Sequence, residues 1–146
     1  MTPTVAGSVP VRPEPVLVDP VPGDRVPEPV LVAARAADDK SGRDTVVLSL
    51  TEPAGITDAF VVTSGQNVRQ VRTIVDEVER RVRAVGGGTP QHVEGLDDAR
   101  WVLMDYGDFL VHVFLEEARA FYDLEHLWSG VPRLQWSAEE VVAAPR

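Results

Sequence analysis

The chain has 146 residues, of which 44% are hydrophobic, so it can bury one packed core and still carry a tail. It holds 14 Lys and Arg residues against 23 Asp and Glu residues, so we expect no direct nucleic-acid recognition as its main activity. It has no cysteine, no apolar run near the ~18 residues of a membrane span and no signal peptide, which predicts a cytoplasmic protein without disulfides or membrane attachment.

Residues 1–28 are predicted to form a disordered or polyproline-like tail. Eight of the twelve prolines lie within residues 1–29, in alternation with valine. Proline removes backbone donors and biases its neighbours to extended conformations, which disfavours a packed helix or sheet. We therefore place one folded domain at residues 29–136, followed by a frayed C-terminal tail at residues 137–146.

The domain is predicted to begin with a helix and a pair of strands. Residues 29–40 are rich in alanine and other helix formers, with Pro29 suited to the first turn and Ser41-Gly42 to the end. The apolar runs at 45–50 and 58–63 predict two strands, joined by a loop that contains a Pro-Ala-Gly turn at 53–55.

A long amphipathic helix follows. Its apolar stripe recurs at three- and four-residue steps, at Val68, Val71, Ile74, Val75, Val78, Val82 and Val85. Ser64 or Asn67 can cap its start, and the triple glycine at 86–88 ends it. Acid-to-base steps of four residues predict the ion pairs Asp76–Arg80, Glu77–Arg81 and Glu79–Arg83 on the solvent side.

The C-terminal half predicts further strands and a shorter helix. Residues 91–94 fit a short strand, and 101–105 with 109–115 fit a hairpin around the turn at 106–108. Residues 116–127 fit a helix with Phe121, Leu124 and either Leu127 or Trp128 turned inward, and 131–136 a last extended segment. The order of elements indicates one sheet with helices packed on it, an α/β or α+β domain.

The stretch 101–128 combines seven of the nine aromatic residues with six acids and a single base, Arg119. Alternation and helical spacing favour a core position for Phe109, Phe114 and Phe121. Four amphipathic aromatics, of a kind enriched at interfaces, accompany them: Trp101, Tyr106, Tyr122 and Trp128. Residue type leaves core and interface open here, and the neighbouring carboxylates suit a basic protein partner better than an anionic ligand.

Candidate catalytic groups in this stretch lack workable spacing. Asp105 and Asp108 flank a turn, where aspartate is common, and a predicted strand-to-helix break separates His112 from Glu116. We expect His112 to be satisfied by a hydrogen bond inside the sheet. The sequence carries no nucleophile elbow, Walker loop or dinucleotide fingerprint, so we expect no catalytic residue, metal or cofactor.

Several segments resemble the ribosomal silencing factor family, also called Iojap. DYGDFLVHVF followed by EEARAFYDLEHLW matches the family signature, and DDKSGRDTVVLSL, ITDAFVVTSG and NVRQVRTIVDEVE match upstream segments in the same order. The resemblance covers about residues 30–128 and excludes the proline-rich tail. It implies a nucleotidyltransferase-like α/β fold with a single mixed sheet, used without catalysis. Nucleotidyltransferases place Gly-Ser before a helix, whereas this chain has Ser64-Gly65 and lacks Asp-x-Asp.

The resemblance also implies a partner and a mechanism. The partner is the large ribosomal subunit, bound through its fourteenth protein, a basic protein on the intersubunit face, so that the small subunit cannot join and translation falls when nutrients are scarce. An exposed aromatic patch would also suit a homodimer off the ribosome. The alternative is a degenerate magnesium-dependent nucleotidyltransferase. The predicted contact residues are Trp101, Asp105, Tyr106, Gly107, His112, Phe121, Tyr122, Leu124 and Trp128.

Overall fold

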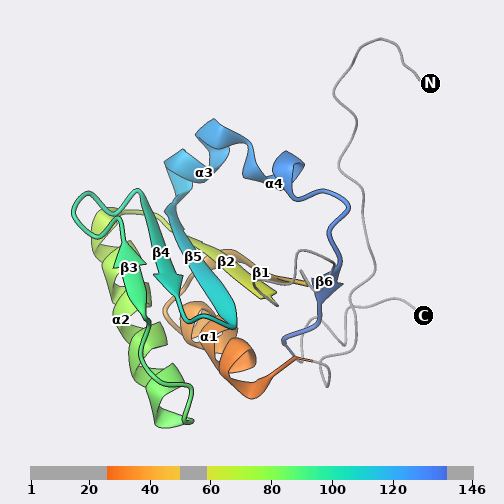
Figure 1. Ribbon diagram of the computed structural model, residues 1–146. Helices are drawn as coiled ribbons and strands as arrows, with labels where there is room; N and C mark the ends of the chain where they lie inside the picture. The colour runs from red at the N-terminus through yellow and green to blue at the C-terminus, as the bar shows by residue number, and fades with distance from the viewer. Residues whose placement is uncertain (1–25, 50–58, 138–146) are drawn as a thin grey trace.

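The computed structural model describes residues 26–49 and 59–137, which form three layers (Figure 1). Helices α1 and α2 cover one face of a single sheet, and the short helices α3 and α4 lie over the other face. The folded part includes Val26, which is buried in the core just ahead of α1. Residues 1–25 of the predicted tail at 1–28, the turn at 53–55 and the segment 138–146 lie outside the described residues.

The sheet is mixed, as the resemblance implies. Its strands are β1 (Arg43–Ser49), β2 (Ala59–Gly65), β3 (His92–Glu94), β4 (Trp101–Asp105), β5 (Phe109–Leu115) and β6 (Arg133–Leu134). They lie in the order β3-β4-β5-β2-β1-β6, and the central β2–β5 pair is parallel while the other pairs are antiparallel. The predicted β1–β2 pair, the short strand β3 and the β4–β5 hairpin are therefore confirmed.

Helices α1 (Glu28–Asp39) and α2 (Val68–Ala84) bury the larger core against the sheet. The apolar stripe of α2 faces the sheet from Val71 to Val82, whereas Val85 lies at the C-cap and is 37% exposed. The Asn67 side chain accepts a hydrogen bond from the Gln70 backbone N–H, which confirms the second of the two predicted caps.

The ion pairs of α2 differ in part from the prediction. Arg80 pairs with Glu77 at 2.6 Å rather than with Asp76, because the two side chains three residues apart also lie on the same face of the helix. Arg81 pairs with Glu77 at 3.6 Å, as predicted, and with Asp39 at the end of α1. The pairing with Asp39 therefore links the two helices of this layer.

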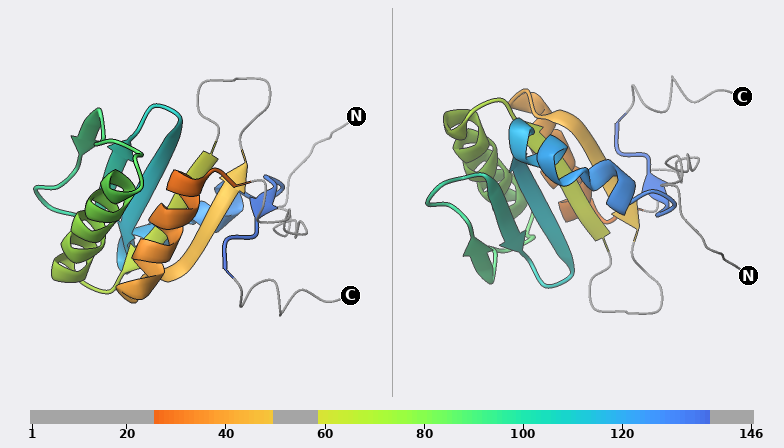
Figure 2. Two further views of the ribbon diagram at one scale, coloured as in Figure 1. Left: turned by 90° about the horizontal axis from the view of Figure 1, so that it is seen from below. Right: turned by 90° about the horizontal axis from the view of Figure 1, so that it is seen from above.

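The opposite layer holds a smaller core and corrects the prediction of one helix over 116–127. The chain forms α3 (Glu116–Tyr122) and α4 (Leu124–Leu127), broken at Asp123, which adopts the left-handed conformation with φ 53°. The break changes the direction of the chain so that Leu124 packs with Leu48, Val62 and Phe114. Figure 2 shows from above that α3 and α4 cross the middle of the sheet and leave the β3–β4 edge uncovered.

Candidate protein-binding surface

The aromatic and acidic residues of the stretch 101–128 divide between the two faces of the sheet. Side chains alternate along a strand, and directly paired residues of neighbouring strands share a face. Trp101 pairs with Phe114 and Leu103 with His112, so these four side chains point toward the layer of α3 and α4. Phe109 points the other way, into the larger core under α1 and α2.

Tyr106 joins Phe109 in the larger core, so the expectation that Tyr106 faces a partner is wrong. Its side chain is only 8% exposed, and its ring stacks on Phe109 with centroids 4.7 Å apart. Burial raises the pKa of Tyr106 to about 12. Its buried hydroxyl has no hydrogen-bond partner within the described part of the chain. The tyrosine therefore acts as a core aromatic at the hairpin turn.

Trp101 lies on the opposite face, and its orientation is fixed from beneath. The indole Nε1–H donates to His112 Nδ1 at 3.0 Å, while 42% of the residue remains exposed. Its ring also lies over Phe114, with centroids 4.9 Å apart. With its N–H used inside the protein, the exposed part of Trp101 offers apolar ring surface to a partner, as an interface aromatic would.

His112 is a buried, neutral histidine, and the predicted hydrogen bond inside the sheet is confirmed at Nδ1, whereas its buried Nε2 has no partner among the described residues. It is 6% exposed, and burial lowers its pKa to about 4. Because Nδ1 accepts the Trp101 proton, the proton of the neutral ring lies on Nε2. The ring also packs edge-on against Phe60, with centroids 4.6 Å apart. The histidine therefore supports Trp101 without charge at neutral pH.

The two short helices extend the surface. Tyr122 is 52% exposed and lies 6.1 Å from Trp101 between ring centroids, and Phe121 packs edge-on against Tyr122 at 5.0 Å. Phe121 is 76% exposed, so its predicted inward orientation is wrong. The left-handed break at Asp123 accounts for this, because Leu124 enters the core in its place. We call Trp101, Phe121 and Tyr122 the aromatic surface.

Two further predicted contact residues support this surface from below. Leu124 is 3% exposed in the smaller core, and the half-buried Trp128 lies 6.1 Å from His112 and 6.3 Å from Phe114 between ring centroids. Leu127, the alternative inward residue, is 68% exposed. Trp128 is thus the side chain that turns inward after Leu124.

The turn between β4 and β5 lies apart from the aromatic surface. Four residue steps separate Trp101 from Asp105 along β4, or about 13 Å of extended chain. The Asp105 carboxylate accepts a hydrogen bond from the Gly107 N–H at 2.8 Å, which makes it a turn-forming group. Gly107 has φ 89°, and a Cβ there would contact the Gln91 side chain, so the turn requires glycine. The nine predicted contact residues therefore do not form one patch.

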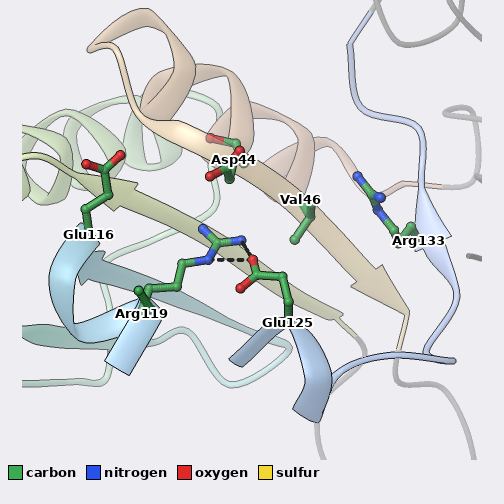
Figure 3. Close-up of a pocket in the computed structure, with 8 residues that line it drawn as sticks. Asp44, Val46, Glu116, Arg119, Glu125 and Arg133 are labelled. Atoms are coloured by element: carbon green, nitrogen blue, oxygen red, sulfur yellow. Dashed lines mark hydrogen bonds and ion pairs between the residues drawn. The ribbon is translucent and has the colours of Figure 1, made fainter. Parts of the chain in front are cut away.

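Arg119 anchors the aromatic surface, and the sequence reasoning missed this role. It is 5% exposed; its guanidinium donates to Ser64 Oγ at 2.8 Å and forms a two-bond pair with Glu125 at 2.8 and 2.6 Å. Figure 3 shows Arg119 and Glu125 meeting from α3 and α4. A buried arginine needs such partners. The sequence offers one indication of this role, because Arg119 is the single base beside six acids within residues 101–128.

A pocket of about 470 Å³ opens beside this pair (Figure 3). It is lined by Asp44, Thr45, Val46, Glu116, Arg119, Ala120, Glu125 and Arg133. The charges are already engaged in part, since Arg119 pairs with Glu125 and Glu116 pairs with Arg43 at 3.2 Å. Ser64, where a nucleotidyltransferase motif would stand, is buried and hydrogen-bonded to Arg119. The polar side chains around the pocket therefore hold the helices against the sheet.

The residues that the structure describes contain neither a metal-binding cluster nor a membrane-spanning helix. Within 26–49 and 59–137, no three His, Asp or Glu residues gather as a metal would require. Over the same ranges, no helix is both long and apolar enough to cross a bilayer. The feature that remains is the exposed aromatic surface beside acidic residues.

Comparisons with known proteins agree on one family. The family model described as "Ribosomal silencing factor during starvation" matches residues 24–146. Ribosomal silencing factor RsfS of Bacillus subtilis is 38% identical over 101 residues, which cover 69% of this chain and 85% of that protein. A mouse protein named "Mitochondrial assembly of ribosomal large subunit protein 1" is 29% identical over 92 residues, covering 62% of this chain and 40% of that protein.

Solved structures give the same result for the fold. A crystal structure of a Chromobacterium violaceum protein has a TM-score of 0.65 at 32% identity, covering 70% of this chain and 85% of that one. A crystal structure of a Bacillus halodurans protein has a TM-score of 0.61 at 38% identity, covering 74% and 97%. These similarities confirm the predicted α/β architecture.

Proposed function

The chain belongs to the ribosomal silencing factor family, and on that premise we propose that it binds the large ribosomal subunit and blocks joining of the small subunit. The contact is the fourteenth protein of the large subunit, a basic protein on the intersubunit face, as the family resemblance implies. Binding there lowers translation in the cytoplasm when nutrients are scarce, and it requires no catalysis. The observation that carries the proposal is the family match across residues 24–146.

Three further observations support this function. The chain has a net charge of −9, which suits a basic partner because opposite fields speed encounter and orient the two proteins. The mouse relative's name refers to the large ribosomal subunit. The aromatic surface offers exposed rings of the type that dominates binding energy at protein interfaces.

We place the centre of the contact on Trp101, Phe121 and Tyr122. His112, Leu124 and Trp128 lie beneath these rings and act by holding them in place. The turn at 105–107 is a second contact further along β4, made by Asp105 and Gly107, since the ring of Tyr106 is buried. The same aromatic surface supports a homodimer off the ribosome, which light scattering of the isolated protein would detect.

A subunit-joining experiment tests the function directly. Purified large subunits are mixed with saturating protein before small subunits are added, and the products are separated on a sucrose gradient. We expect the protein to sediment with large subunits and the peak of assembled ribosomes to fall. Adding the protein after joining is the control for order. Unchanged assembly at saturation, with the protein at the top of the gradient, would refute the proposal.

A further inference from the structure

A small pocket on the uncovered β3–β4 edge adjoins the aromatic surface. It has a volume of about 290 Å³ and is lined by Glu94, Gly95, Trp101 and Leu103. We propose that this pocket, here called the cation slot, receives one lysine or arginine side chain of the basic partner, between the Trp101 ring and the Glu94 carboxylate. This assignment rests on the proposed function and names the chemistry by which the partner is recognised.

The backbone builds the slot from residues of two strands. Glu94 pairs directly with Leu103 across β3 and β4, and Trp101 is two residues from Leu103, so their side chains emerge on one face. Gly95 has φ 90°, and a Cβ there would collide with the carbonyl oxygen of Trp101. The turn that follows β3 therefore requires glycine.

Trp101 presents to the slot a surface that favours a cation. Its N–H is committed to His112, so the part of the indole that lines the pocket offers the π-system of the ring rather than a donor. The face of an indole carries negative charge density and attracts ammonium and guanidinium groups. The aliphatic part of a lysine or arginine side chain would pack on the half-buried Leu103 while its charged end reaches the rim.

The charges at this edge carry a small acidic excess. Those of the slot and the turn that follows β3 are Glu94, Asp97 and Asp98, against Arg72 and Arg100, with His92 beside Glu94. Arg72 already donates to the carbonyl oxygens of Leu96 and Asp97 at 2.9 and 2.7 Å. One Glu94 carboxylate oxygen accepts a hydrogen bond from His92 Nε2 at 2.6 Å, and the side chain is 63% exposed. Its other oxygen is therefore available to a partner's cation.

The test measures binding of full-length variants to purified large subunits by co-sedimentation at low and moderate salt. Glu94→Gln keeps the shape of the side chain and removes its charge, and we expect binding roughly five- to tenfold weaker with a shallower salt dependence. Asp76→Asn removes the same charge from an exposed position on α2 and is the matched control. Glu94→Gln combined with Trp101→Leu is expected to cost less than the sum of the two single variants, because both groups contact one cation.

The possible results test the cation slot and the proposed function separately. If the wild-type protein sediments with large subunits and Glu94→Gln behaves like Asp76→Asn, the slot is wrong while the function stands. If the wild-type protein does not bind large subunits, the function fails, and the slot is judged by titration with an arginine tetrapeptide. The NMR signal of the Trp101 indole N–H should then shift in the wild-type protein and not in Glu94→Gln. No shift in the wild-type protein would overturn the slot as well.

Discussion

His112 shows how one buried residue affects both stability and the aromatic surface. Its pKa is lowered from 6.5 to about 4 by burial. In the unfolded chain the His112 ring therefore binds a proton near pH 6.5, whereas in the folded protein it does so only near pH 4. The unfolding free energy therefore has its full value above pH 6.5, the pKa in the unfolded chain, and decreases as the pH falls toward about 4, the pKa in the folded protein. Near neutral pH the ring is uncharged, and its Nδ1 accepts the Trp101 proton.

We predict that His112→Asn flattens the pH dependence of stability. Between pH 7 and pH 5 the wild-type protein should lose about 2 kcal/mol of unfolding free energy through this one group, given the lowered pKa. Asparagine carries no titrating group but can place an oxygen near the position of Nδ1. Urea denaturation of both proteins at the two pH values measures the difference. Equal losses in the two proteins would show that His112 is not buried neutral.

Tyr106 is the residue at which sequence and structure differ most, and it yields a second prediction. Tyr106→Phe removes a buried hydroxyl that has no partner among the described residues, so stability should stay equal or rise. Tyr106→Ala removes the ring stacked on Phe109 and should cost about 3–5 kcal/mol. Urea denaturation measures both. A stable Tyr106→Ala variant with weakened ribosome binding would instead return Tyr106 to the interface.

Elements with a simple period could be predicted from the sequence, and those set by a single distant contact could not. The stripe of α2 locates its buried face because burial repeats with the geometry of the backbone, and the alternation along β5 assigns its residues to two faces that are both largely buried. The break at Asp123 has no such period. It is spanned by contacts of Arg119 with Ser64, 55 positions earlier, and with Glu125 in the next helix, which local sequence does not reveal. Phe121 was misplaced for the same reason.

The Arg119–Glu125 pair is predicted to hold α4 on the sheet. Arg119→Met should lower the unfolding free energy by about 1–3 kcal/mol, because the buried Ser64 hydroxyl loses its donor and α4 loses its tie to α3. Hydrogen exchange should quicken at the amides of His126 and Trp128, which bond to Asp123 and Leu124 carbonyl oxygens.

Arg43→Met provides the control for this variant. The Arg43–Glu116 pair is exposed, with 53% and 38% of the two side chains accessible, so its loss should cost less than ~1 kcal/mol. The exchange of α4 should stay unchanged in that variant. If the α4 amides exchange equally fast in both arginine variants, the Arg119–Glu125 pair does not set the position of the helix.

At the scale of the whole molecule, the two faces of the sheet have different roles. The face under α1 and α2 is filled by the larger core, which also takes Tyr106 and Phe109. The other face is only partly covered by α3 and α4. The aromatic surface joins the last two residues of α3 to Trp101 at the start of β4. Alternation in the sequence can assign a strand residue to a face. It cannot reveal which face is left open, because that depends on where two short helices end.

The open face leads to a prediction that separates binding from folding. Phe121→Ser changes a side chain that is 76% exposed, so the unfolding free energy should move by no more than ~0.5 kcal/mol. Binding to large subunits should weaken by about 2 kcal/mol, or roughly 30-fold, if the ring is a central interface residue. Val85→Ser, at an exposed valine beyond α2, controls for loss of apolar surface on the opposite layer. Thermal unfolding and co-sedimentation of both variants measure the two effects. A Phe121→Ser protein that binds as well as the wild type would show that Phe121 is not a central residue of the contact.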